Sequence, residues 1–107
     1  MAVCWVRAGI CGHETTIEII KTSQTKVKVS FMTSCEHVQS LSEELTELDI
    51  GSEMTKPMNE TLTYTLAAKH LCRNSCIIPA AILKAMETTA GIFLPESCTI
   101  EFVEGAV

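Results

Sequence analysis

Residues 26–33 alternate between apolar and polar side chains, as in a strand with one buried and one solvated face. The apolar positions are Val27, Val29 and Phe31, and the polar positions are Lys26, Lys28 and Ser30. Two earlier segments, residues 5–11 and residues 14–21, also have the composition of strands. Because residues 22–24 make a polar turn, the sequence predicts an antiparallel sheet with one dry face.

The hydrophobic period changes from that of a strand to that of a helix after Ser34, which is the predicted N-cap. Apolar side chains then recur at helical spacing, at Val38, Leu41, Leu45 and Leu48. Two more helices are expected, over residues 60–72 and from Pro79 to Gly91, followed by a last strand near residues 94–102. The predicted fold is α+β, an antiparallel sheet of three to four strands with helices on one face, in the order β-β-β-α-α-α-β.

Length, net charge and cysteine content limit the class of protein that this chain can belong to. A chain of 107 residues makes one domain, residues 1–107, and can bury a core without disulfides. Its net charge of -5 argues against nucleic-acid binding, and no apolar run reaches the roughly 18 residues of a membrane span. Because the first residues do not resemble a secretory signal, the six cysteines favour thiol or metal chemistry in a reducing cytoplasm.

Four of the six cysteines fall at predicted ends of strands and helices. Cys11 ends the first strand, Cys35 starts the first helix, and Cys72 and Cys76 flank the joint between the next two helices. Ends of elements can converge at one end of an α+β sandwich, where thiolates suit zinc, copper(I) or an iron–sulfur cluster. We therefore predict a metal or cofactor site formed by these four thiolates, with His13 as a substitute ligand or as a donor to a ligand.

Local charge also favours thiolates at this predicted site. Cys35 and Cys76 lie near helix starts, where unpaired backbone N–H groups and the helix dipole stabilise negative charge. Lys69 and Arg73 add positive charge beside Cys72. The same features would activate a cysteine nucleophile.

The remaining polar and sulfur-bearing residues carry weaker signals. Cys4 is predicted to have no function, and Cys98 is predicted to be a core residue of the last strand. His37 and His70 are expected on the surface. The acidic residues are expected on a solvated helix face: Glu43, Glu44, Glu47, Asp49 and Glu53.

Short motifs are spread over nearly the whole chain. They are Ala8-Gly9-Ile10-Cys11-Gly12, Ser34-Cys35, the Cys72-x3-Cys76-x2-Pro79 joint with Ile82-Leu83-Lys84 after it, Ala90-Gly91 and Leu94-Pro95. With these motifs the chain resembles a family of small uncharacterised proteins from methanogenic archaea and anaerobic bacteria. That resemblance implies an oxygen-poor cytoplasm, where iron–sulfur chemistry is easily maintained, and implies no specific activity.

The order of the cysteines supports a second, more distant resemblance. Cys11-Gly12 follows the first strand, Cys35 follows the third strand before a helix, and Cys76 or Cys72 lies late in the chain. In this layout the chain is similar to iron–sulfur cluster scaffold proteins, although His13 stands where they have an Asp and no chaperone-binding motif is present. The resemblance implies cluster or metal binding.

Three functions remain open from the sequence. The first is a metal-binding or iron–sulfur protein, scaffold-like or active in electron transfer. The second is a metal-free thiol protein, with a reversible Cys72–Cys76 disulfide or with Cys35 as a nucleophile next to His37. The third is an interaction module whose acidic segment, residues 43–53, faces a basic protein partner. A symmetric homodimer that shares a cluster is a further expectation, and no motif assigns an enzymatic reaction.

Overall fold

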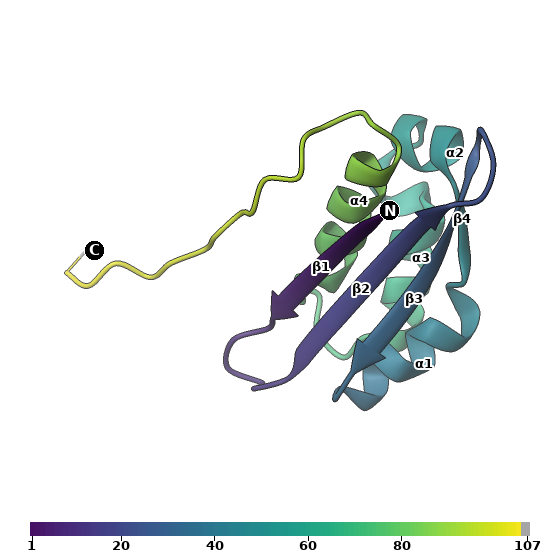
Figure 1. Cartoon of the computed structure of the whole chain (residues 1–107). Coiled ribbons are helices and arrows are strands. Elements are labelled where there is room, and N and C mark those ends of the chain that lie inside the picture. The colour runs from purple at the N-terminus through teal and green to yellow at the C-terminus, as the bar shows by residue number, and fades with distance from the viewer. Residues whose placement is uncertain (106–107) are drawn as a thin grey trace.

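A single antiparallel sheet, covered by helices on one face, forms the body of the protein (Figure 1). The computed structural model describes residues 1–105. The sheet has the order β1-β2-β3-β4, with strands Ala2–Arg7, Glu14–Lys21, Lys26–Thr33 and Glu47–Asp49. The helices are α1 (Glu36–Glu44), α2 (Ile50–Thr55), α3 (Leu62–His70) and α4 (Ile78–Thr89), with a short 3-10 helix η1 (Met58–Glu60). The predicted α+β class is therefore confirmed.

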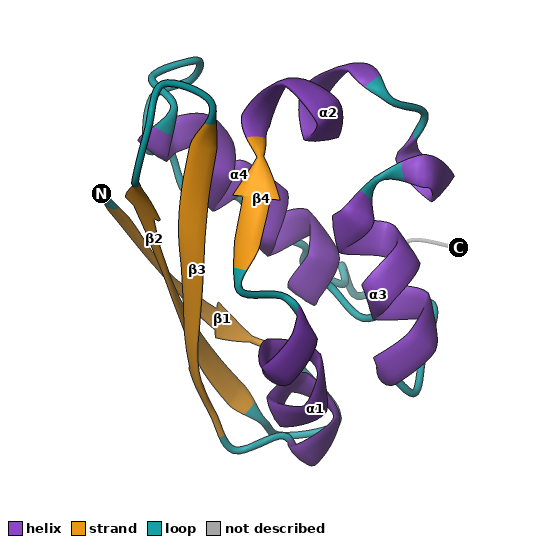
Figure 2. Cartoon of the chain, turned by 90° about the vertical axis from the view of Figure 1, so that its right-hand side faces the viewer, coloured by secondary structure: helices purple, strands orange, loops and turns teal. Residues whose placement is uncertain are grey.

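The core lies between the sheet and the helical layer, as the side view shows (Figure 2). Helix α4 packs on β1 and β2, and α1 packs on β3. The predicted alternation in β3 is confirmed, because Val27 is fully buried while Met32 is 77% exposed on the opposite face. The fully buried apolar side chains come from both layers: Ile17, Ile19, Val27, Leu41, Leu45, Leu48, Ile78, Ile82 and Met86.

Helix α1 is shorter than its hydrophobic period predicts. The helix ends at Glu44, and Leu45 is its C-cap. The chain then extends into β4, where Leu48 pairs with Val27 of β3. Burial of Leu48 satisfies a helical period and a strand equally well, so the apolar spacing alone could not distinguish the two structures.

Residues 50–60 fold into α2 and η1, although the sequence predicted neither of these two elements. Asp49 caps α2, because its carboxylate accepts a hydrogen bond from the Ser52 N–H at 2.9 Å. Glu53 is only 6% exposed, so its predicted place on a solvated face is wrong. Its carboxylate accepts from the backbone N–H groups of Leu62 and Thr63, at 2.8 and 2.9 Å, and also from the Thr63 hydroxyl. Glu53 therefore fixes the start of α3 against α2.

Two predicted strands differ from the structure. The first strand ends at Arg7, because Gly9 and Gly12 adopt positive φ angles and turn the chain towards β2. The predicted last strand is absent from the described chain: residues 91–105 leave α4 at Gly91 (φ +79°) and project away from the body as an unpaired tail (Figure 1). Cys98 is exposed on this tail, so its predicted core position is wrong. Among residues 1–105, no helix has the length and apolar character to cross a membrane.

Candidate thiol site

Three junctions between elements lie at the same end of the sheet, the lower end in Figure 1. They are the β1–β2 loop, the β3–α1 junction and the α3–α4 joint. These junctions carry the four cysteines singled out by the sequence: Cys11, then Cys35, then Cys72 and Cys76. Residues 1–105 include all six cysteines of the chain, and each one is a free thiol.

The β1–β2 loop is fastened to the β3–α1 junction by His13. The Nδ1 atom of His13 is 3.0 Å from the Ser34 hydroxyl oxygen, and the Ser34 N–H donates to the Glu14 carbonyl at 3.3 Å. These bonds tie the loop that carries exposed Cys11 to the residue before the N-cap of α1. Because Nδ1 is engaged by Ser34, a ligand role for His13 falls to its Nε2 atom.

Cys35, and not the predicted Ser34, is the N-cap of α1. Its backbone is extended (φ −89°, ψ 121°), and within the described chain its side chain makes no capping hydrogen bond. The Cys35 N–H donates to the Thr33 hydroxyl at 3.1 Å, which fixes the backbone. The thiol is half-buried against the hydrophobic core, so its position is set by the helix and the sheet together.

The α3–α4 joint holds its two cysteines differently. Helix α3 ends at its C-cap Leu71, and Cys72 follows it on the surface. Cys76 is half-buried against the core, and its N–H donates to the Arg73 carbonyl at 3.3 Å. Pro79 occupies the first turn of α4, as predicted. One thiol of the pair, Cys76, is thus packed against the core, and the other, Cys72, is exposed.

The pKa of the Cys76 thiol depends on its burial and on the other cysteines near it. Burial raises the pKa of the Cys76 thiol, although a hydrogen bond from the Ile78 N–H opposes this effect. The negative charges of three other cysteines, Cys35, Cys11 and Cys72, raise the same pKa further. Cys76 therefore lies within electrostatic reach of each of the other three thiols. The helix start does stabilise a thiolate at Cys76, but burial outweighs it.

The raised pKa of Cys76 has a measurable consequence. In reduced, chelator-treated protein, alkylation of Cys76 by iodoacetamide should reach half its maximal rate at a higher pH than alkylation of a cysteine in an unstructured peptide. Peptide mapping by mass spectrometry across a pH series measures this midpoint. A midpoint at or below that of the peptide would contradict the described burial.

Lys69, which was predicted to add positive charge beside Cys72, makes its contact with Glu44 instead. Lys69 donates to Glu44 at 2.6 Å, and this bond holds the pKa of the Glu44 carboxyl below its usual range. The Nε2 atom of His70 is 3.2 Å from the same carboxylate. Across residues 1–105, no three side chains of His, Cys, Asp or Glu are close enough to hold one metal ion. The four thiols lie at one end of the sheet, but no three of them are close enough together to hold one metal ion.

Two structural features escaped the sequence reasoning. One is the capping role of Glu53, which a single Glu in an acidic run does not indicate. The other is a hollow of about 360 Å³ between α2, η1, α3 and α4, whose lining includes Met54, Met58, Tyr64 and Leu83. Only the packing of these four elements creates it, so no local pattern could have predicted it.

Fold and site together define a small α+β protein with a cluster of thiols at one end of its sheet. The chain belongs to a family of unknown function (DUF6951), whose model matches residues 2–102. Neither a curated protein nor a solved structure matches the chain. The predicted membership of an uncharacterised family is thereby confirmed.

Proposed function

We propose that this protein binds a soft metal ion or an iron–sulfur cluster through the thiolates of Cys11, Cys35, Cys72 and Cys76. The observation that carries the proposal is the arrival of four thiols, from three separate junctions, at one end of the fold. Three of them raise the pKa of the fourth, so together they disfavour negative charge. A bound cation would reverse this repulsion and hold the cysteines as thiolates.

The donor set fits such a group in its chemistry. Sulfur ligands select zinc, copper(I) or an iron–sulfur cluster over hard cations such as magnesium. Cys35 and Cys76 would form the fixed half of the site, because both pack against the core. Cys11 and Cys72 would form the movable half, because both are exposed on loops. Binding would draw these two side chains inward, with His13 Nε2 as an additional or replacement donor.

The proposed role is to carry a cluster, to transfer electrons or to respond to a metal. The order of Cys11, Cys35 and Cys76 along the chain supports the likeness to iron–sulfur scaffold proteins, as an expectation drawn from the sequence. We place the protein in an oxygen-poor cytoplasm, where free thiols and clusters persist. A protein partner that donates or accepts the metal, or a second copy that shares it, belongs to the same proposal.

Metal content tests the proposal directly. The protein is purified without oxygen, and its absorption spectrum, iron, zinc, copper and acid-labile sulfide are measured on one sample. Alanine at Cys35 or Cys76 should reduce bound metal at least about tenfold, because even loss of a group that only supports a ligand costs about 10–100-fold in metal affinity. Alanine at Cys4 is the matched control, because this cysteine is also half-buried but lies in β1. Its metal content should equal that of the unmodified chain.

Two results would overturn metal binding. One is equal metal content in all these variants, and the other is the absence of metal after attempted reconstitution. In the second case, a Cys72–Cys76 disulfide detected by mass spectrometry in oxidised protein would favour the thiol-redox function. Glu53 is buried, so the third function would rest on the exposed acidic residues of this segment: Glu43, Glu44, Glu47 and Asp49.

A further inference from the structure

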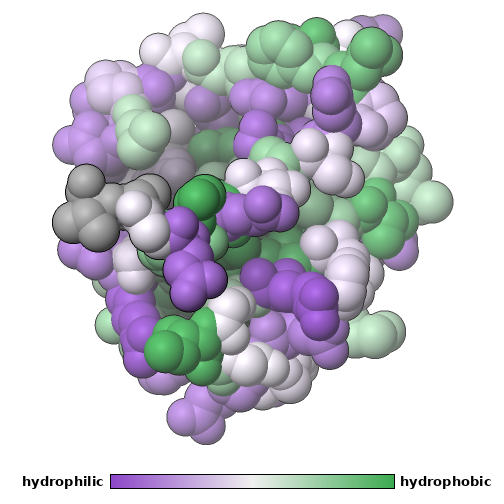
Figure 3. Space-filling view, turned by 90° about the vertical axis from the view of Figure 1, so that its left-hand side faces the viewer, coloured by the Kyte–Doolittle hydropathy of each residue, from purple (hydrophilic) through white to green (hydrophobic). Residues whose placement is uncertain are grey.

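The tail after α4 exposes apolar side chains that nothing in the described chain covers. Ile100 is 77% exposed and Phe102 is 99% exposed. Residues 98–103 nevertheless alternate in the manner of a strand, with Cys98, Ile100 and Phe102 in one phase. Figure 3 views the molecule from the side on which the tail projects, and it shows hydrophobic side chains in the recessed surface around the tail. A segment with this pattern is suited to pair with a sheet edge.

Strand β1 offers such an edge. Among the described residues it pairs with β2 alone, so the backbone groups on its other side have no strand partner. The side chains of β1 alternate as well: Val6 is buried under α4, whereas Trp5 is 60% exposed on the opposite face. The free edge of β1 can therefore pair with another strand that has one apolar face and one solvent-exposed face.

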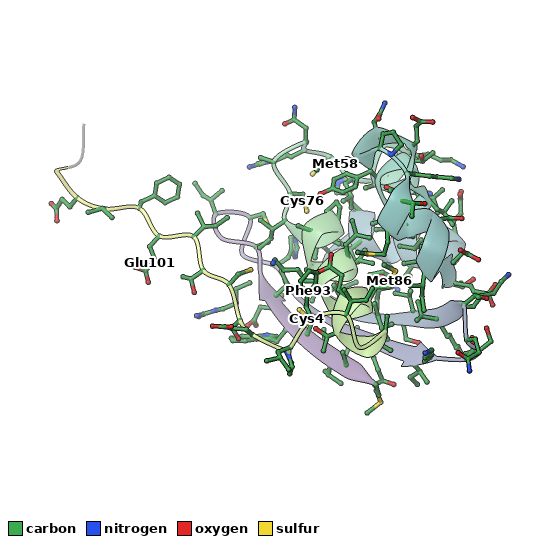
Figure 4. The ribbon with its side chains drawn as sticks, turned by 90° about the horizontal axis from the view of Figure 1, so that it is seen from above. Cys4, Met58, Cys76, Met86, Phe93 and Glu101 are labelled. Atoms are coloured by element: carbon green, nitrogen blue, oxygen red, sulfur yellow. The ribbon has the colours of Figure 1, made fainter. Side chains whose placement is uncertain are left out.

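The tail comes near this edge at Cys98, and the chain beyond Cys98 points away from the sheet (Figures 1 and 4). In Figure 1 the tail leaves the end of α4 and runs in the same direction as β1, and in Figure 4 the labelled Glu101 lies far out along it. Burial raises the pKa of the Cys4 thiol, and the charge of Cys98 raises it further. Cys98 of the tail thus lies within electrostatic reach of Cys4 of β1.

We propose that residues 98–103 dock on the free edge of β1 of their own chain, as a fifth strand parallel to it, with Cys98 beside Cys4. This register places Ile100 beside Val6, so that both apolar side chains face α4. It also places Thr99 beside Trp5 and Glu101 beside Arg7 on the outer face.

The charges of the two segments support this register. The tail carries three acidic residues, Glu96, Glu101 and Glu104, and no Lys or Arg, whereas β1 carries Arg7 and no acidic residue. Arg7 lies over the Trp5 ring, with Cζ 5.2 Å from the ring centroid, so its charge is held on the face where Glu101 would lie. An antiparallel tail with Cys98 beside Cys4 would instead put Glu96 beside buried Val6, where an unpaired carboxylate is costly.

Cys4 and Cys98 provide the test, because a disulfide between them would form readily only if the tail docks on β1. A chain with serine at Cys11, Cys35, Cys72 and Cys76 keeps only Cys4 and Cys98, and it is treated with diamide. The two thiols lose two protons and two electrons to diamide, which is reduced to the hydrazine, and one S–S bond forms. Monomeric disulfide should form at least about tenfold faster than in the matched variant that also carries Cys98→Ser and Thr99→Cys, because that thiol would point to the opposite face.

A second measurement keeps all native cysteines. Hydrogen exchange of the β1 amides is compared between the full reduced chain and a chain that ends at Pro95, and the full chain should show slower exchange. Mainly dimeric disulfide would overturn the proposal in favour of exchange between two copies. Equal disulfide rates in the two variants, or equal exchange in the two chains, would also overturn it. Neither readout depends on metal, so failure here is separable from failure of the proposed metal site.

Discussion

Alanine in place of Ile19 should lower the free energy of unfolding by about 3 kcal/mol, the middle of the range for a buried Ile or Leu. Ile19 is fully buried in β2, between Ala2 of β1 and Val29 of β3. Its removal leaves a cavity between the sheet and α4, which the close-packed core cannot fill without strain. A loss of this size is a large part of the roughly 5–15 kcal/mol that holds a small domain folded.

The neighbouring residue provides the control for this experiment. Ile20 lies on the opposite face of β2 and is 39% exposed, so alanine there should cost about 1 kcal/mol or less. Urea unfolding followed by circular dichroism measures both variants. Equal losses would show that the outer face of the sheet is buried in solution, for instance against a second copy, and would contradict the one-faced sheet described above.

Alanine in place of Glu53 should have a comparable effect, about 3 kcal/mol, from loss of a buried hydrogen-bonded charge. The substitution leaves the N–H groups of Leu62 and Thr63 without their acceptors in a site that water hardly reaches. It should therefore loosen the start of α3. Glu53→Gln keeps one acceptor oxygen and should cost less than alanine.

Glu47 is the matched acidic control for Glu53. Its carboxylate is exposed and pairs with Lys26 at 3.3 Å, and such surface pairs contribute about 0–1 kcal/mol. Unfolding of Glu47→Ala and Glu53→Ala in the same buffer separates the two situations. If the two variants lose equal stability, the carboxylate of Glu53 does not hold the start of α3 in solution.

Some elements could be predicted in full from the sequence. The bounds of β2 and β3 agree with prediction, because β2 is rich in β-branched Thr and Ile, β3 alternates between apolar and polar side chains, and both flank a short polar turn. The buried positions at Val38, Leu41, Leu45 and Leu48 are also confirmed. The structure adopted by residues 47–49 was not predicted, because only the pairing with β3 makes them a strand.

The candidate site was predicted in its residues but not in its arrangement. The local sequence places Cys11, Cys35, Cys72 and Cys76 at ends of elements, and the fold brings those ends to one end of the sheet. Lys69 illustrates the opposite case. It is close to Cys72 in sequence, but its side chain on α3 pairs with Glu44 on α1. The Cys4–Cys98 proximity lay outside any local pattern, because it depends on the path of the chain after Gly91.

The sequence by itself determined which faces are apolar, where the chain turns, and which residue types could bind a soft metal. These properties follow from side-chain chemistry and from the periods of strands and helices. Tertiary structure alone decided which of the four cysteines are half-buried, that Glu53 would accept hydrogen bonds from the start of α3, and that residues 98–103 would have no strand partner among the described residues. Those outcomes depend on contacts between residues far apart in the chain, and local periodicity carries no information about such contacts.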